Sequence, residues 1–483
     1  MIRTLLVIAF ATTAWPQSQE LALKSRQARE LMAAGRYADA IPIYKDLVKA
    51  VPNEPRLLMN LGLAQQMAGR CSEAVVPLAT AAKAAPELFP AWVTLGVCYM
   101  EMGNTARAIP PLEKAVSLAP REAEPQRMLA AALVSAGRLE AAVLRFRQLA
   151  QIEPSDPSVW YGLGKACEAL SERAFGRLSK TAPDSAYTLA LGAEAQLSRK
   201  QYAPAFALYK KALERKPGLR GANAALAAIY RATGHPDWAA ASERKEAALP
   251  KANCAIAKQE CAFRDGRYLD ATRAPQTPAP EHLYWQSRAW EALAGQAFSK
   301  LASLPPSVES RRLNAQLAAG RDNPMEAAKE LREAIKMAPG DRQLRAELAV
   351  ALHDARDHAG AREVLTELLK EDPGSPLFSF MLGDTLLELG EVEKAVAYLE
   401  KGARRGAQAR AALGMAYARS GQLAKALPLL EAGAASDTDG RIHFQLARAY
   451  REAGQADRSK AAMEKYQQLQ ARPESEQPQI TGP

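Results

Sequence analysis

The sequence predicts an all-α fold: a solenoid of about twelve to thirteen helical hairpins stacked along a right-handed superhelix. The first observation is self-similarity with a period of 34 residues, seen in windows 55–88, 89–122, 123–156 and 342–375. The second is composition, because aromatic residues are only 6% of the chain, which favours closely packed helices over sheets. Such a period indicates stacked units that share a continuous core, so the 483 residues need not divide into separate globular domains.

Three repeated columns explain why each unit should form a hairpin. In three consecutive units the first column holds a small residue: Gly62, Gly96 and Ala130. The second column holds a turn glycine: Gly69, Gly103 and Gly137. The third column holds a closing proline: Pro86, Pro120 and Pro154. The small residue allows two helices to cross closely. The glycine suits the positive φ that ends a first helix, and the proline stops the second helix because it lacks an N–H.

The unit from 89 to 122 carries the fullest form of the pattern. It reads Trp92-x-x-Leu95-Gly96-x-x-Tyr99 and continues with Gly103, Ala108, Leu112, Ala115 and Pro120. The unit from 157 opens in the same way, with Trp160-x-x-Leu163-Gly164. These residues closely resemble the tetratricopeptide repeat, and about a dozen units in register extend the resemblance over nearly the whole chain after its first residues. The resemblance implies a helix-hairpin solenoid, here of an exported bacterial type.

Residues 1–16 are predicted to be a signal peptide. Arg3 gives a positive start, residues 5–14 are an apolar run, and small residues at 12–14 suit cleavage. The run is shorter than the about 20 apolar residues of a membrane-spanning helix, although an uncleaved anchor is the main alternative. We therefore expect an exported protein, periplasmic or extracellular, with no transmembrane span after signal removal.

The rest of the chain should divide where the repeat pattern weakens. We expect an N-terminal array at 17–250, followed by degenerate repeats or a hinge at 251–307. A C-terminal array should follow at 308–470, and a disordered tail at 471–483. Within the first array, the unit from 157 should keep its first helix and have a shortened second one. The stretch 251–307 contains proline-rich breaks and should form two degenerate hairpins.

The charge pattern and the histidines point away from nucleic acid and from catalysis. The net charge is +10, but most basic residues alternate with acidic ones, as on solvated helix faces. A peripheral contact with an anionic envelope surface fits better than nucleic acid. The five histidines show no metal-binding spacing, and Gly162-Leu163-Gly164 occupies the helix-crossing columns rather than a phosphate loop. We expect no enzyme activity, no catalytic residues, no cofactor and no metal site.

Two of the five cysteines, Cys254 and Cys261, are a candidate disulfide. On one continuous helix they would lie about 10 Å apart along the axis, whereas a disulfide allows a Cα separation of about 7 Å at most. The bond therefore requires a non-helical start to the segment, near 253–256, and free thiols are the open alternative. The other three cysteines occupy columns of buried residues and should be free thiols.

The family resemblance also implies where a partner binds. Tetratricopeptide ligands usually lie in a concave groove lined by the first helix of each hairpin. The matching positions here are mainly apolar in the early units and more polar later: Met59, Leu63, Met67, Val93, Val97, Met100, Tyr161, Lys165, Phe380 and Asp384. Adaptable methionines suit an apolar peptide or helix. The same residues could instead be covered by a neighbouring superhelical turn or by the tail.

The leading hypothesis is a non-enzymatic exported scaffold that binds a protein or peptide in this groove. Two alternatives stay open: a structural or glycan-associated component of the cell envelope, in which Tyr161 and Tyr187 could contact sugars, and a regulator of a separately encoded exported enzyme. One subtype of the family binds a C-terminal carboxylate through Lys and Asn in paired groove columns, but this chain has Met59 and Leu63 there. The fold does not identify the ligand.

Overall fold

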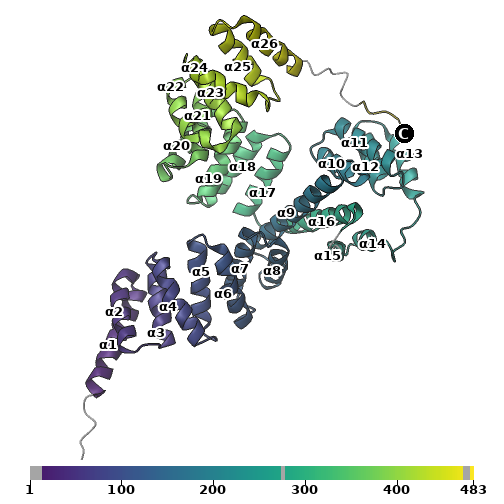
Figure 1. Ribbon diagram of the computed structural model, residues 1–483. Helices are drawn as coiled ribbons and strands as arrows, with labels where there is room; N and C mark the ends of the chain where they lie inside the picture. The colour runs from purple at the N-terminus through teal and green to yellow at the C-terminus, as the bar shows by residue number, and fades with distance from the viewer. Residues whose placement is uncertain (1–13, 274–277, 471–478, 483) are drawn as a thin grey trace, which may run out of the picture. The chain divides into compact units, whose positions relative to one another are not determined.

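The computed structural model describes residues 14–273, 278–470 and 479–482. Within these ranges it contains twenty-six α-helices and one short 3-10 helix, and none of the described residues forms a β-strand (Figure 1). The all-α class is therefore confirmed. The predicted signal peptide, residues 1–16, lies almost entirely outside the described residues. No helix of the described ranges combines the length and the apolar character that crossing a membrane requires.

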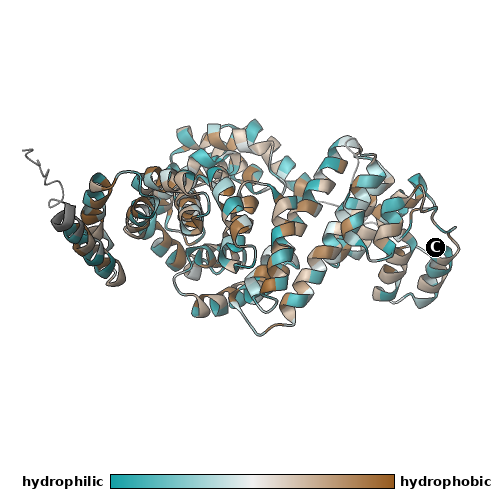
Figure 2. Cartoon of the chain, turned by 90° about the horizontal axis from the view of Figure 1, so that it is seen from below, coloured by the Kyte–Doolittle hydropathy of each residue, from teal (hydrophilic) through white to brown (hydrophobic). Residues whose placement is uncertain are grey.

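Consecutive helices pair into hairpins along most of the chain. The first pairs are α1 (Ala14–Ala33) with α2 (Tyr37–Ala50), α3 (Pro55–Met67) with α4 (Cys71–Ala84), α5 (Phe89–Glu101) with α6 (Thr105–Leu118), and α7 (Ala123–Ser135) with α8 (Leu139–Ile152). Two further pairs are α10 (Ala186–Ser198) with α11 (Tyr202–Arg215) and α12 (Ala222–Ala232) with α13 (Pro236–Ala247). Hydrophobic and hydrophilic residues alternate around these helices, as expected when one side packs and the other faces water (Figure 2).

The later hairpins follow the same plan. They are α17 (Val308–Gly320) with α18 (Pro324–Met337), α19 (Arg342–Asp354) with α20 (His358–Glu371), α21 (Pro376–Glu388) with α22 (Val392–Gly402), α23 (Ala407–Arg419) with α24 (Leu423–Ala434), and α25 (Arg441–Glu452) with α26 (Ala456–Gln470). A 3-10 turn, η1 (Ala403–Arg405), follows α22. These hairpins share one continuous core of alanine and leucine side chains. The stacked-hairpin architecture expected from the 34-residue period is confirmed.

The residues in the repeated columns have the close packing and the turn conformation expected from the sequence. A Cβ built on Gly62 would lie 2.4 Å from Leu78 Cγ, so a larger residue there would force Leu78 or the two helices to shift. The turn glycine Gly69 has φ +73°, a conformation that side chains with a Cβ rarely adopt. Arg356, which replaces glycine at the same column, also has a positive φ of 58°. The turn geometry is therefore kept even where the glycine is lost.

Contacts divide the chain into two compact units. One comprises residues 1–172 and 290–300, and the other comprises 173–289 and 301–483. All three boundaries fall inside long helices: one lies in α9 (Pro157–Thr181) and two lie in α16 (Pro280–Ala302). These two helices therefore contribute residues to both units.

The helix α9 corrects the expectation of a shortened second helix after 157. It is one uninterrupted helix of 25 residues. The turn column that holds Gly137 in the preceding unit holds Ser171 here. Ser171 is buried and helical, and neither a glycine nor a proline stands near it to stop the helix. The first helix consequently continues through the position where its turn was expected.

The stretch 251–307 also differs from the two degenerate hairpins expected there. It contains a short pair, α14 (Lys258–Arg264) and α15 (Tyr268–Ala271), and then the single helix α16 of 23 residues. Residues 274–277, in the proline-rich break, lie outside the described residues. The apolar residues of 284–301 repeat with helical periodicity, and they belong to one long helix.

The last part of α16 completes a hairpin that α9 begins. In regular hairpins the small residue of the first helix packs on a leucine of the second helix, as Gly62 does on Leu78 and Gly96 on Leu112. Gly164 stands at the same column of α9, and a Cβ placed on it would clash with the ring of Phe298. Residues 290–300, more than a hundred positions later, therefore fill the place of the missing second helix within the first unit.

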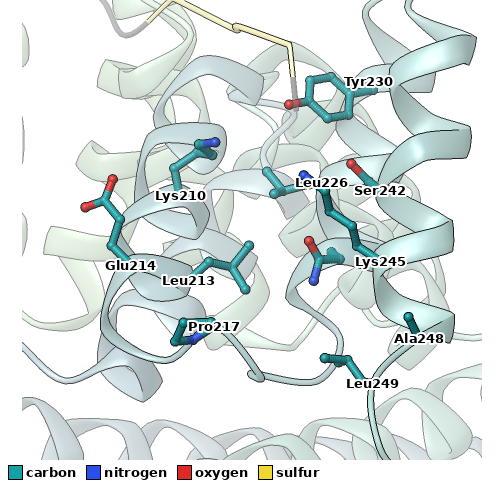
Figure 3. Close-up of a pocket in the computed structure, with 11 residues that line it drawn as sticks. Lys210, Leu213, Glu214, Pro217, Leu226, Tyr230, Ser242, Lys245, Ala248 and Leu249 are labelled. Atoms are coloured by element: carbon teal, nitrogen blue, oxygen red, sulfur yellow. The ribbon is translucent and has the colours of Figure 1, made fainter.

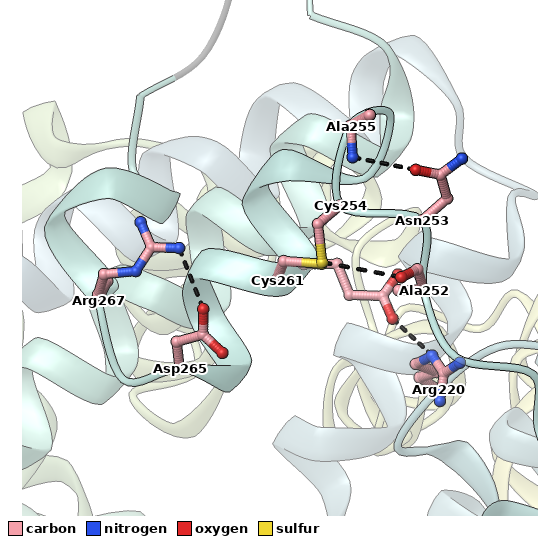
Figure 4. The surroundings of a disulfide bond; sticks show 9 residues. Arg220, Ala252, Asn253, Cys254, Ala255, Cys261, Asp265 and Arg267 are labelled. Atoms are coloured by element: carbon pink, nitrogen blue, oxygen red, sulfur yellow. Dashed lines mark hydrogen bonds and ion pairs between the residues drawn. A yellow bond between two sulfur atoms is a disulfide. The ribbon is translucent and has the colours of Figure 1, made fainter.

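The structure joins Cys254 to Cys261 by a disulfide, with the two Cα atoms 5.7 Å apart (Figure 4). Residues 254–256 form a turn, and α14 begins only at Lys258, so the two cysteines do not share a continuous helix. A buried ion pair between Arg220 Nε and Glu260 Oε1, 2.6 Å apart, ties the same helix to the residues before α12. The disulfide and the ion pair anchor this segment in addition to its apolar packing, in which Phe263 contacts Tyr268 and Trp285.

Reduction of this disulfide should destabilise the α14 segment by about 2 kcal/mol, because the bond closes a short loop. The expected signs are faster amide hydrogen exchange in residues 254–271 of the variant Cys254→Ser/Cys261→Ser and unchanged exchange in α3–α8. Thiol titration of unfolded, unreduced protein should detect the three free cysteines, Cys71, Cys98 and Cys167. A count of five would contradict the bond.

The end of the chain differs in part from the expected disordered tail. Residues 471–478 and 483 lie outside the described residues, so the expectation is not tested for them. Residues 479–482 lie against α12 and α13, where Ile480 packs on the core cluster that contains Tyr230. Four residues of the tail are thus an ordered part of the second unit.

Candidate partner-binding groove

The first helices of successive hairpins lie next to one another. In the first unit α3 contacts α5 and α5 contacts α7, and in the second unit α21 contacts α23 and α23 contacts α25. Side chains on the open side of these helices therefore form continuous surfaces. This is the arrangement that the groove positions of the sequence require.

The structure brings six of the predicted groove residues together on two neighbouring helices. Met59, Leu63 and Met67 come from α3, and Val93, Val97 and Met100 come from α5. We call these six residues the α3–α5 surface. Five are half-buried, while Met67 is 45% exposed. Met59 packs partly on the core cluster that contains Leu58. The surface therefore contacts the core at Met59 and is open to solvent at Met67.

Polar contacts fix the spacing of α3 and α5. Gln66 Nε2 donates a hydrogen bond to Glu101 Oε1 over 2.8 Å, and the thiol of Cys71 donates to the other oxygen of Glu101 over 3.1 Å. Burial, with smaller contributions from Cys98 and Glu101, raises the pKa of the Cys71 thiol well above its usual range. Burial likewise raises the pKa of Cys167 to about 12. These thiols are structural and are not activated nucleophiles.

The next predicted groove residues, Tyr161 and Lys165, lie half-buried on α9 in the same unit. Lys165 Nζ pairs with Glu168 Oε2 at 2.5 Å, so its charge is already partnered within the helix. Neighbouring Trp160 donates its indole N–H to the carbonyl of Pro154 over 2.8 Å, just as Trp92 does to Pro86 over 2.9 Å. The tryptophan therefore ties each of these two units to the preceding turn.

The glycan-associated alternative needs aromatic side chains gathered at one place. Tyr161 belongs to the first unit and Tyr187 to the second. Tyr187 is packed on Tyr284, with ring centroids 5.2 Å apart, and its hydroxyl accepts a hydrogen bond from Lys216 Nζ over 2.5 Å. The structure gives Tyr187 a packing role within the second unit.

The second unit places Phe380 and Asp384 on α21. Asp384 Oδ2 is hydrogen-bonded to His353 Nε2 of the adjacent first helix α19, over 2.8 Å. Apolar side chains are exposed on the same row of first helices, including Val350 at 45% and Leu377 at 39%. Arg419 extends the polar links by donating to the carbonyl of Leu387 over 2.8 Å. The surface formed by α19 and α21 is therefore more polar than the α3–α5 surface.

The bond to Asp384 raises the pKa of His353 above its usual value, and the nearby charge of Asp354 acts in the same direction, while burial opposes it. Protonated His353 should therefore stabilise the fold fully below the unfolded-state pKa of about 6.5. This contribution is lost as pH rises through the higher folded-state pKa.

We expect the free energy of unfolding of the second unit to fall as pH rises above about 6.5, and the fall to be smaller in Asp384→Asn. The pKa of His353, followed by NMR, should drop in that variant. Asp46→Asn, which changes an exposed aspartate on α2, should alter neither quantity. An unchanged His353 pKa in Asp384→Asn would contradict this account.

Within 14–273, 278–470 and 479–482, no group of three or more His, Cys, Asp or Glu side chains is arranged to hold a metal ion. His353 and His358 have ring centroids 6.1 Å apart, in an edge-on contact. They form a small aromatic contact and not a pair of metal ligands on one helix.

Comparison with known families agrees with this architecture. Models described as tetratricopeptide repeat match residues 99–166 and 352–419, residues 25–89 and 312–376, and residues 440–473. Together these matches span more than half of the chain. The chain belongs to the tetratricopeptide repeat family. Tetratricopeptide repeat proteins are generally interaction scaffolds without catalytic activity of their own.

Several solved tetratricopeptide repeat structures are similar to parts of the chain. One from Parabacteroides merdae ATCC 43184 is 13% identical, with a TM-score of 0.32, over 69% of this chain and 99% of its own. YrrB, titled a protein with an unusual peptide-binding site, is 16% identical, with a TM-score of 0.30, over 43% and 94%. MamA from Desulfovibrio magneticus RS-1 is 22% identical, with a TM-score of 0.29, over 30% and 82%. No curated protein sequence matches the chain.

Two features of the tetratricopeptide array were not foreseen from its sequence. The bond between His353 and Asp384 joins adjacent repeats, and aligning the repeat columns would have shown that both residues lie on the groove side of neighbouring first helices. The docking of residues 479–482 on α12 and α13 had no comparable signal. A short segment with one isoleucine shows no periodicity from which its partner could be read.

Proposed function

We propose that this protein is a non-enzymatic scaffold that binds a protein or peptide partner on the α3–α5 surface. The observation that carries the proposal is a row of methionine, valine and leucine side chains on adjacent first helices, left half-open although the rest of each hairpin is tightly packed. Apolar side chains in such a row can accept the apolar face of a helix or an extended peptide. Methionine side chains adapt their shape to the ligand.

The partner should be largely apolar where it meets this surface. The six residues of the α3–α5 surface are uncharged, and the polar side chains beside them, Gln66 and Glu101, are bonded to each other. Charged side chains placed directly on these six residues would lose water without gaining an opposite charge from them. Specificity would then come from the shape of the apolar row and from the glutamate at its edge.

We further propose that the protein works outside the cytoplasm. Two observations support this: the signal-like sequence at residues 1–16, and the disulfide between Cys254 and Cys261, which forms and persists in oxidising compartments. A partner in the cell envelope follows from the same argument. Cell fractionation with an antibody to the mature chain, together with the N-terminal sequence of the recovered protein, tests this localisation.

The variant Leu63→Glu/Val97→Glu should keep the helical circular dichroism signal and lose partner binding by about 100-fold or more, because two charges would be buried at the centre of the contact. The measurement is a cross-linked pull-down from the envelope fraction, quantified by mass spectrometry against wild type. Val76→Glu/Leu144→Glu is the matched control. It adds the same charge on the second helices α4 and α8, where these side chains are 70% and 58% exposed.

A partner recovered by wild type and by the control, but not by the groove variant, would support the α3–α5 surface as the binding site. Equal recovery by all three proteins would rule this surface out. Unfolding of the groove variant would show instead that Leu63 and Val97 are core residues, which would also overturn the proposal.

A further inference from the structure

The hairpin α12–α13 ends a regular run of repeats. In the regular arrays the helix after each hairpin packs on its second helix, as α5 does on α4 and α7 on α6. After α13 the chain leaves this pattern, because residues 249–257 contain no helix and α14 begins only at Lys258. The side chains of the last hairpin are therefore not covered by a following repeat helix of the usual kind.

The C-terminal segment 479–482 lies on this hairpin through three separate contacts. The hydroxyl of Tyr230 donates a hydrogen bond to the carbonyl oxygen of Thr481 over 2.8 Å. Ile480 packs on the core cluster of the hairpin. Gly482 lies over Trp238, where an added Cβ would be 3.4 Å from the indole ring. Figure 3 shows the Tyr230 hydroxyl pointing to the C-terminal trace.

The residues that receive the segment are held rigidly by their own packing. Tyr230 is 1% exposed, and its ring lies 5.8 Å from that of Phe206 and 5.6 Å from that of Trp238. Trp238 is in turn stacked on His235, with centroids 4.1 Å apart. Burial raises the pKa of Tyr230, so its hydroxyl keeps the proton that it donates. A fixed donor to a main-chain carbonyl, beside an apolar contact, is how extended peptides are held.

The site is larger than the segment that occupies it. A cavity of about 510 Å³ begins at Tyr230 and extends between α11, α12 and α13, lined by Leu213, Leu226, Lys210 and Lys245 among others (Figure 3). None of residues 479–482 belongs to its lining. A peptide held at Tyr230 and Trp238 would therefore have room to continue past these residues.

We propose that residues 479–482 are an intramolecular ligand, which reversibly occupies a site for an extended peptide on α12 and α13. The inference is independent of the α3–α5 surface, because it rests on different residues in a different unit. One hydrogen bond and one partly buried isoleucine give weak binding in isolation. The eight residues 471–478, which connect the segment to α26, supply an effective concentration of about 1 mM and so allow a weak ligand to remain bound.

The test uses a fluorescein-labelled peptide with the sequence of residues 471–483 as its probe. Fluorescence anisotropy is measured against the full-length chain and against a chain that ends at Gln470. The chain without the tail should bind the peptide, and the full-length chain should bind it at least tenfold more weakly, because its own tail occupies the site. Thermal unfolding of both proteins verifies that the shorter chain is folded.

Two substitutions test whether the peptide binds through the contacts seen at Tyr230 and Ile480. Tyr230→Phe, made in the shorter chain, keeps the packed ring but removes the donor, and should weaken peptide binding about fivefold. A peptide carrying Ile480→Asp should bind at least tenfold more weakly than the native sequence. Tyr44→Phe, which removes a buried tyrosine hydroxyl from α2, is the matched control and should leave binding unchanged.

The proposal is overturned if the shorter chain fails to bind the peptide at about 1 mM, since the tail could not then occupy the site from its tether. Equal binding by the two chains would also overturn it. A full-length chain that is dimeric, with a monomeric shorter chain, would show that the segment docks on a second copy and not on its own hairpin. None of these outcomes depends on the partner of the α3–α5 surface.

Discussion

Gly402→Ala is expected to lower the free energy of unfolding of the C-terminal hairpins by about 2–3 kcal/mol. Gly402 ends α22, and an added Cβ would lie 2.7 Å from the Cα of Phe380 and 2.8 Å from its backbone nitrogen. Because the obstacle is backbone, no change of side-chain rotamer can relieve it. The helices α21 and α22 would have to move apart, and the core between them would lose packing.

Gly295→Ala is the matched control for this prediction. Gly295 is an exposed residue inside α16, and an added Cβ would meet nothing within 4 Å. This change should be neutral or stabilise by up to about 1 kcal/mol, because alanine favours helix. Hydrogen exchange resolves the effect by hairpin, which matters because repeat arrays need not unfold in one step. Equal stability of the two variants would show that α21 and α22 are less closely packed than described.

Gly164→Ala is expected to destabilise the first unit by about 2 kcal/mol, and Phe298→Leu should recover part of that loss. The reason is that Gly164 of α9 faces the ring of Phe298 on α16. Leucine is the residue that the crossing glycine meets in other hairpins, for example Leu112 opposite Gly96. The smaller side chain should therefore make room for the new methyl group.

A double-mutant cycle measures this coupling. Urea unfolding of wild type, the two single variants and the double variant should give a favourable interaction energy of about 1 kcal/mol or more. Additive effects would mean that residues 290–300 do not take the place of a second helix beside α9. The same cycle on Gly96 and Phe298, which belong to different hairpins, should be additive.

The sequence predicts those parts of the structure that are determined by single residues or by near neighbours in the chain. Gly69, Gly103 and Gly137 each specify a turn by their own conformational freedom, and all three have positive φ in the structure. The hairpins around them were therefore predictable one at a time. Ser171 carries no such signal, and the helix α9 that runs through it can be understood only with Phe298, a partner distant in the chain.

The candidate site, too, can be predicted from the sequence only where it is built by neighbours in the chain. The repeat columns place Met59 and Leu63 on one helix and Val93 and Val97 on the next, and the structure sets these helices side by side. Periodicity suffices for this because the α3–α5 surface is built by neighbours in sequence. The contact of Tyr230 with Thr481 joins residues 251 positions apart. It depends on a single hydrogen bond and on side-chain shape, for which the repeat pattern contains no rule.

The shared helices α9 and α16 have a consequence for the order of folding during synthesis. The hairpins α1–α8 need only neighbours in sequence, so each can form soon after it leaves the ribosome. The first half of α9 must wait for residues 290–300, because Leu163 and Cys167 lie beside Leu293 and Ala297 of α16. Over this interval the nascent chain exposes an apolar helix face, and a chaperone that recognises such faces should bind there. Chains halted between residues 182 and 289 should capture it, whereas chains extended well past residue 300 should release it.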